Sequence, residues 1–413
     1  MACHILSSID LLSCVFSYQD GLIGALWPLL SLSHPSLDDL EHLDVDTFAQ
    51  SDCVLRPWYT QHALTRMDAL TRSSHLRDLV VLHAVYYDQL DVLECMARRY
   101  FNDCLDDELD FVWYDQLIDL AAYRGHLRIV NFLHDAGHDG CTTEAMDWAA
   151  THGFQSVVEY LHLHRKEGCT QYAMSGAASN GHLPIVAYLH ENRREGCFPW
   201  AMDAAAAAGH DHVVHYLHSK RSEGCTIAAM NGAAVNGHIS IVAFLHENRR
   251  EGCTVQAMNG AAEHGHLDVV KCLHSHRHEG CSKHAMNGAA ARGYLEVVQW
   301  LHAHRSEGCS MDAMDRGAIN GHLDVVKWLH ANRTEGCSAW ALNGAAQAGH
   351  LHIVQWLVEH RSEGCIEWAL RGARMHGQLQ IQRWLDEYTK QMKTHSSKAL
   401  QVLSSAVLPC LTA

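Results

Sequence analysis

Apolar and polar positions follow one another along most of the chain in a pattern that recurs every 28 residues. In residues 281–308, an alanine-rich segment ends at Gly293, and Leu295, Val298 and Leu301 then follow at helical spacing. A glycine after an alanine-rich segment is typical of a helix that closes in a left-handed turn, and the later apolar residues share one helical face. Each copy is therefore expected to form a helix, a turn, a second helix and a further turn.

A cysteine opens each copy of the pattern. The nine residues at this constant spacing are Cys141, Cys169, Cys197, Cys225, Cys253, Cys281, Cys309, Cys337 and Cys365. A spacing that never changes predicts one small unit copied many times, so the chain is expected to be a repeat array. Ser or Thr follows most of these cysteines, as at Ser282, and is a preferred N-cap residue. The cysteine and the methionine five residues later would then form a hydrophobic staple.

Metal binding and disulfides are the alternative roles for these cysteines, and distance excludes both. Equivalent residues of stacked repeats lie one helix layer apart, roughly 8–10 Å. A disulfide requires Cα atoms within about 7 Å, and zinc requires sulfur atoms at about 2.3 Å. We therefore expect free structural thiols, no metal and no cofactor.

Histidines also recur in register. The ladder after the turn glycine is His126, His182, His210, His238, His266, His322 and His350. The ladder at the end of the second helix is His134, His162, His190, His218, His246, His274, His302 and His330. Histidines that recur in every layer are expected to form hydrogen bonds with carbonyls or amides of the turns. Phe154 and Tyr294 replace histidine in the first ladder, which a metal-binding or catalytic role would not allow. The alternative is a pH-responsive array, in which protonation of buried neutral histidines loosens the stack.

Composition narrows the function classes. The net charge of −16 argues against a nucleic-acid partner, because phosphates call for a basic surface. Residues 1–32 resemble neither a signal peptide nor a membrane span, so we expect an intracellular, cytoplasmic protein without a membrane contact. The sequence contains no Gly-rich phosphate loop, nucleophile elbow or isolated carboxylate pair, so no catalytic residues are assigned and an enzyme is not expected.

The segment Ala262–His274, AEHGHLDVVKCLH, resembles the second half of an ankyrin repeat. The resemblance covers residues 76–388 and implies an all-α, ankyrin-like helix-turn-helix solenoid of about eleven repeats, which binds a protein partner and is monomeric. Two features depart from the family. The unit has 28 residues instead of about 33, which leaves no room for the β-hairpin finger. The threonine-proline-leucine-histidine opening is replaced by cysteine and threonine.

Positions that vary between copies are the candidates for partner contact, since the resemblance implies that first helices line a concave face. Counting the cysteine as one, positions 4 and 8 share a helical face. The predicted partner-binding residues are Trp148, Tyr172, Trp200, Gln256, His284, Asp312, Arg316, Trp340 and Trp368. Position 8 is mostly glycine, which either allows close packing of first helices or forms a smooth groove for a ligand. A second aromatic series, from Tyr160 to Trp384, is expected to pack between repeats.

The two ends fall outside the period. Residues 1–75 are expected to form an N-terminal helical cap, or a short F-box-like module within Ile5–Leu22. The second reading would make the protein a substrate adaptor for ubiquitin ligation. Residues 389–413 are expected to form a flexible, frayed C-terminal tail. The identity of the protein partner does not follow from the sequence.

Overall fold

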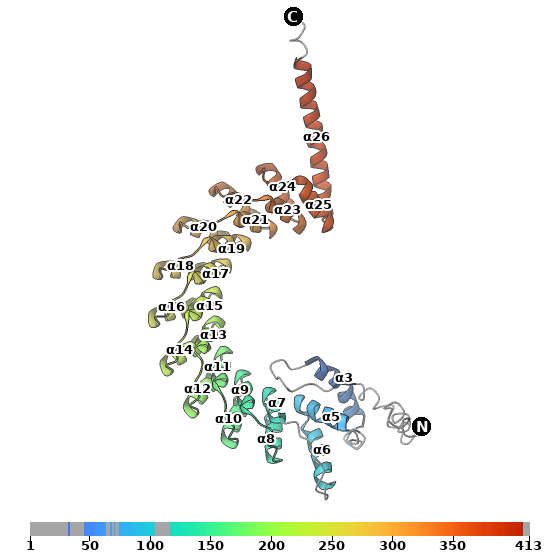
Figure 1. Ribbon diagram of the computed structural model, residues 1–413, viewed down its shortest axis with the longest axis vertical. Coiled ribbons are helices and arrows are strands. Elements are labelled where there is room, and N and C mark those ends of the chain that lie inside the picture. Colours follow the sequence, from blue (N-terminus) through green and yellow to red (C-terminus); the bar gives the residue numbers. More distant parts are fainter. Residues whose placement is uncertain are drawn as a thin grey trace, which may run out of the picture. The chain divides into compact units, whose positions relative to one another are not determined.

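The computed structural model describes residues 32–33, 45–62, 67, 70, 74–103 and 116–407, and this part contains α-helices and no strand. The chain divides into two units, Met1–Ala201 and Met202–Ala413. In each unit, helix pairs of the repeat follow one another along the chain (Figure 1). No helix in the described ranges has the length and apolarity that crossing a membrane requires.

The helices of the first unit are α3 (Val45–His62), α5 (Ser74–Tyr86), α6 (Leu90–Asp103), α7 (Leu117–Tyr123), α8 (Leu127–Asp135), α9 (Thr143–Thr151), α10 (Gln155–His164), α11 (Gln171–Ser179) and α12 (Leu183–Asn192). Helix α13 (Trp200–Ala208) begins in the first unit and ends in the second. The second unit continues with α14 (Asp211–Lys220), α15 (Ile227–Val235), α16 (Ile239–Asn248), α17 (Val255–Glu263), α18 (Leu267–His276), α19 (Lys283–Ala291), α20 (Leu295–His304), α21 (Met311–Ile319), α22 (Leu323–Asn332), α23 (Ala339–Ala348), α24 (Leu351–His360), α25 (Ile366–Met375) and α26 (Leu379–Val407).

Both helix boundaries of the repeat lie where the sequence predicts them. Ser282 is the N-cap of α19, and its side chain accepts a hydrogen bond from the amide of His284. Gly293 follows the same helix with φ of 81°, a left-handed conformation that other residues rarely adopt. With the N-cap at Ser282, Cys281 and Met286 occupy the two positions of a hydrophobic staple. The cysteines of the described ranges form no disulfide in this structure.

The core of each unit lies between the helix layers. In the first unit, α9 packs against α7, α10 and α11, and in the second, α19 packs against α17, α20 and α21. Alanines and the methionine of the first helix are buried, as are three aliphatic residues of the second helix, Val297, Val298 and Leu301 in α20. An amphipathic helix pair cannot bury its apolar face alone, so stacking of neighbours supplies the core.

A polar contact between neighbouring repeats was missed by the sequence analysis. Counting the cysteine of each repeat as position 1, position 7 lies in the first helix and carries Asp or Asn in most copies. This side chain forms hydrogen bonds with the N-cap residue of the next copy. Asp119 accepts hydrogen bonds from the amide and the hydroxyl of Thr142 at 2.9 and 2.7 Å. Asn287 accepts from the Ser310 amide at 3.0 Å and donates to its hydroxyl at 2.8 Å. We call each such couple a cap pair; the others are Asp147–Thr170, Asp203–Thr226, Asn231–Thr254, Asn259–Ser282 and Asp315–Ser338.

The turn that ends each repeat is held by an arginine. Arg305 is the C-cap of α20 in an extended conformation and forms a salt bridge with Glu307. Its guanidinium also donates a hydrogen bond at 3.4 Å to Nδ1 of His274, which belongs to the preceding repeat. The same arginine lies against Gly280, where an added Cβ would come within 2.5 Å of it. A side chain thus stabilises the turn in place of the hairpin finger.

The histidine ladders have packing roles in several copies. His126 and His238 of the first ladder contact the carbonyls of Tyr86 and Ala207 through Nε2 at 3.0 and 3.1 Å, as predicted. In the second ladder, the ring of His274 meets Trp300 of the next repeat at 5.1 Å and 87°, an edge-to-face contact. The second aromatic series therefore packs between repeats in this way, which confirms its predicted role at Trp300.

The described N-terminal residues pack on the first helix pairs. Phe48 of α3 stacks on Tyr86 of α5 at 4.0 Å, and Leu55 and Trp58 are buried. His83 contacts Asp52 at 3.1 Å, and burial lowers the pKa of this histidine to about 4. Residues 5–22, on which the F-box-like alternative rests, lie outside the described part of the chain.

The described part of the C-terminal end is helical. Helix α26 continues from Leu379 to Val407 without interruption, so residues 389–407 are helical. The reason lies in the sequence: this segment contains neither glycine nor proline, and the first helix breaker after Gly377 is Pro409. Residues 408–413 fall beyond the described range.

Candidate protein-binding site

The predicted partner-binding residues lie on the first helices, and most are exposed. Tyr172 and Trp200 of the first unit are 59% and 40% exposed, and Trp340 and Trp368 of the second unit are 65% and 70% exposed. The remaining four in the second unit are also exposed: Gln256, His284, Asp312 and Arg316. Trp148 is half-buried.

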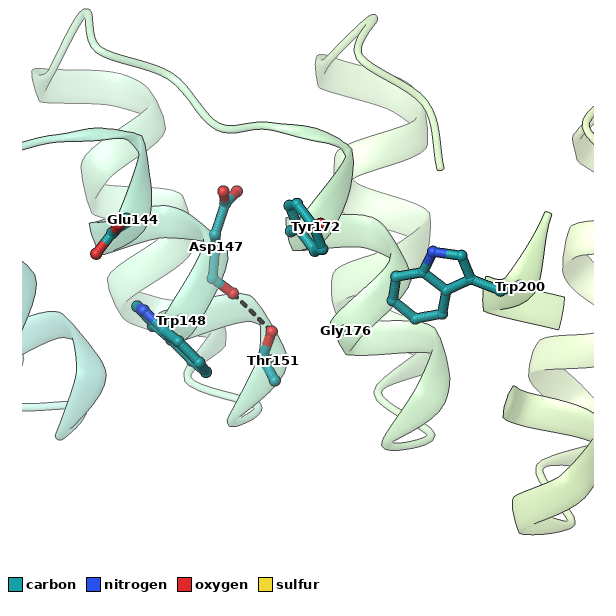
Figure 2. Close-up of a pocket in the computed structure, with 7 residues that line it drawn as sticks. All are labelled: Glu144, Asp147, Trp148, Thr151, Tyr172, Gly176 and Trp200. Carbon is teal, nitrogen blue, oxygen red and sulfur yellow. Dashed lines mark hydrogen bonds between the residues drawn. The ribbon is translucent and has the colours of Figure 1, made fainter. Parts of the chain in front are cut away.

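Three of these aromatic residues surround one hollow in the first unit. Trp148 of α9, Tyr172 of α11 and Trp200 at the start of α13 line it. The hollow has a volume of about 340 Å³, and its other lining residues are Glu144, Asp147, Thr151 and Gly176 (Figure 2). Tyr172 and Trp200 occupy the same position in successive copies, so the repeat itself brings their rings to within 6.3 Å between centroids. The other predicted residues do not line this hollow.

The hollow coincides with departures from the repeat pattern. At position 8, Trp148 replaces the usual glycine and packs edge-to-face on Tyr123, at 5.5 Å. Between the repeats that begin at Cys169 and Cys197, both residues of the cap pair differ from the usual ones. Ser175 stands in place of Asp or Asn, and Phe198 in place of Ser or Thr. Only one hydrogen bond of the pair persists there, from the Phe198 amide to the Ser175 hydroxyl at 3.0 Å.

The change in the cap pair places a fourth aromatic ring, that of Phe198, next to the three that line the hollow. Phe198 stacks on Trp200 at 5.7 Å and 14°, and contacts Tyr172 at 5.1 Å. A capping hydroxyl contributes typically about 1 kcal/mol to helix stability. Phe198 has no such hydroxyl, so the helix loses this stabilisation while an aromatic ring is placed next to Tyr172 and Trp200. Departures from locally stable sequence of this kind are found mainly at functional sites. Phe198 was not among the predicted partner-binding residues, although the sequence shows that it replaces the usual Ser or Thr and that Ser175 replaces the usual Asp or Asn.

The hollow is acidic. Glu144 is exposed at its rim in the first turn of α9, and the carboxylate of Asp147 accepts bonds from the amide and hydroxyl of Thr170 at 2.8 and 2.6 Å. Burial raises the pKa of Asp147, and the nearby charge of Glu144 acts in the same direction. The seven lining residues include no lysine or arginine.

The glycines at position 8 are explained by packing of first helices. A Cβ on Gly260 would lie 2.3 Å from Val235 Cγ2 of the preceding repeat, and one on Gly344 would lie 2.3 Å from Ile319 Cγ1. Real Cβ contacts are longer, so each glycine allows a close approach that any side chain would prevent. Of the two interpretations of these glycines, the structure supports close packing.

Helix pairs that stack on their neighbours, with their turns held by side chains, define an all-α repeat solenoid, a class of protein that presents extended binding surfaces. Residues 284–330 match the family of ankyrin repeats that occur in many copies. This match agrees with the ankyrin resemblance in the sequence, and the helix pairs of the described chain repeat the same arrangement on either side of it. No curated protein matches the chain.

Proposed function

We propose that this protein is a non-enzymatic scaffold that binds another protein, and that the hollow between Trp148, Tyr172 and Trp200 is a docking site. Ankyrin repeats in general are protein–protein interaction modules, which supports the first part of the proposal. The single observation that carries the second part is that the hollow lies at a cluster of breaks in the repeat pattern: Trp148 lines it, and Phe198, which replaces the usual N-cap residue, contacts its lining residues Tyr172 and Trp200.

The chemistry of the hollow suits a protein ligand. Tryptophan and tyrosine dominate the energetics of protein interfaces because they bury large areas with few rotatable bonds. Tyr172 and Trp200 retain 59% and 40% of their surface in the free protein, so a partner can bury it. Tyr172 and Phe198 contact one another, which holds the rings in place before binding.

Proximity labelling in the native cell tests this proposal. The full chain is compared with a Tyr172→Ala/Trp200→Ala variant and with Leu163→Ala, a control in the same unit that removes an exposed apolar side chain from the second helix α10. A partner recovered with the wild type and the control, and lost with the double variant at unchanged helicity, is the expected result. Equal recovery of the same proteins with all three chains would refute the docking site.

A truncation that keeps the contacts of α3 with α5 tests the adaptor alternative. Because Phe48 stacks on Tyr86 and Asp52 contacts His83, removal of residues 1–75 would expose the face of α5. A chain that begins at Val45 keeps these contacts and removes Ile5–Leu22. A ligase component that is recovered with the full chain and not with residues 45–413 would favour the adaptor.

The pH-responsive alternative depends on the second histidine ladder. Nδ1 of His274, His302 and His330 accepts a hydrogen bond from an arginine of the next repeat, at 3.3–3.4 Å, and protonation of Nδ1 would remove this bond. A melting temperature that stays constant between pH 7.5 and 5.5 would exclude this alternative.

A further inference from the structure

We propose that the hollow receives a cationic side chain, an arginine or a lysine, from a basic segment of the partner protein. The cation would lie between the rings of Trp148 and Tyr172 and beside the carboxylates of Glu144 and Asp147. This inference rests on the proposed function and adds the chemical class of the ligand to it.

The arrangement of the rings favours a cation. Figure 2 shows Trp148 and Tyr172 on different sides of Asp147 and Thr151, with Trp200 beyond Tyr172. The face of an aromatic ring carries negative charge density and attracts an ammonium or guanidinium group within about 6 Å of its centroid. Tryptophan is the strongest of the aromatic side chains in this respect, and the hollow contains two.

The carboxylates supply the opposite charge. Glu144 lies at the exposed rim, and within the described ranges it forms no ion pair with a basic side chain. Asp147 accepts two hydrogen bonds from Thr170, and the amide of Ala173 also acts on its carboxylate. Because Asp147 is largely buried, its negative charge would attract a cation in the hollow without a direct hydrogen bond, and the cap pair would stay intact.

The electrostatic balance of the hollow is incomplete in the free protein. Asp147 is buried near the like charge of Glu144, and both effects disfavour its ionised form. The lining residues contribute no positive charge, and the whole chain carries a net charge of −16. A positive side chain would compensate the two carboxylates, and its charge would also steer a basic partner toward this surface. An apolar side chain would bury both carboxylates without compensation.

The size of the hollow fits a single side chain. Its volume of about 340 Å³ is at the lower end of the range for ligand pockets. The exposed faces of Tyr172 and Trp200, beside Phe198, continue from it along the first helices, where an apolar neighbour of the cationic residue can pack. The preferred ligand is therefore a basic residue flanked by an apolar one.

Titrations of the full chain with defined peptides test this inference. The probes are acetyl-Gly-Phe-X-Gly-amide peptides in which X is arginine, lysine, citrulline or norleucine. Binding is followed by NMR of the tryptophan indole groups, with the Trp148 and Trp200 signals assigned from Trp148→Phe and Trp200→Phe. We expect saturable shifts of these two signals, with apparent Kd values for arginine and lysine at least about fivefold below those for citrulline and norleucine.

Two variants connect the preference to the carboxylates. Glu144→Gln should raise the apparent Kd of the arginine peptide at least about fivefold. Glu159→Gln, which removes a carboxylate on the second helix of the same repeat, should leave it unchanged. Equal binding of arginine and norleucine, no effect of Glu144→Gln, or no binding of any peptide up to 1 mM would overturn the inference. The proposed function would still stand if the Tyr172→Ala/Trp200→Ala variant lost its partner in the cell, so the two failures can be told apart.

Discussion

Substitution of Gly260 by alanine tests the close packing of first helices. In an exposed helix interior, glycine to alanine stabilises by roughly 0.8–1 kcal/mol. Here the added Cβ would lie 2.3 Å from Val235 Cγ2, and valine is held by its branched Cβ in a narrow choice of rotamers. Overpacking of this kind costs typically about 1–3 kcal/mol. The two effects together predict a net destabilisation of about 1 kcal/mol.

Chemical unfolding followed by circular dichroism measures this change. A matched control is Gly317→Ala, because most other copies have alanine at this position and the nearest contact of a new Cβ is the Ala290 carbonyl oxygen at 3.3 Å. We expect Gly317→Ala to raise the unfolding midpoint and Gly260→Ala to lower it. In a Val235→Ala background, Gly260→Ala should lose its cost, because the closest atom is then the Cβ of residue 235, at 3.3 Å. A midpoint raised by Gly260→Ala alone would refute the reasoning.

Three further predictions concern the cap pairs and the thiols. Asp315→Asn should be neutral or stabilising in chemical unfolding, because asparagine makes the same pair elsewhere, whereas Asp315→Ala should cost about 1–3 kcal/mol by leaving the Ser338 amide unpaired. Burial raises the pKa of Asp119 to about 6, so the folded chain holds this proton more tightly than the unfolded chain. The stability of the wild type relative to Asp119→Asn should therefore fall by about 3 kcal/mol in all as the pH rises from about 3 to about 7, and then stay level; a difference that is constant with pH would contradict this. Burial raises the pKa of Cys337 to about 11, so mass spectrometry after brief alkylation at pH 8 should find it largely unmodified and the exposed Cys53 modified; equal labelling would contradict the structural role of the thiols.

The repeat architecture could be predicted because one set of local signals recurs many times. Serine or threonine at the N-cap, glycine in the left-handed turn and the apolar face of the second helix each follow from local physical chemistry. The cap pair between Asn287 and Ser310 does not follow from periodicity within a helix, because it joins residues 23 positions apart in neighbouring repeats.

The candidate site could be predicted only in part. Tyr172 and Trp200 were identified because they vary at a position shared by all copies, and the structure places both at the hollow with Trp148. Periodicity does not predict which variable positions share a hollow, since this depends on side-chain packing between layers. Phe198 can be recognised as a departure from the pattern only when the cap pair that it interrupts is known.

Site-specific photo-crosslinking shows whether the partner contacts the hollow between Trp148, Tyr172 and Trp200. The full chain with p-benzoylphenylalanine in place of Tyr172 is irradiated in the native cell, and the same residue at Leu163 serves as the control. We expect that one protein, recovered also by proximity labelling, is crosslinked at residue 172, and that Trp200→Ala abolishes this product. Crosslinking of that protein at residue 163 alone, or at residue 172 with the same yield after Trp200→Ala, would contradict the claim that the hollow binds the partner.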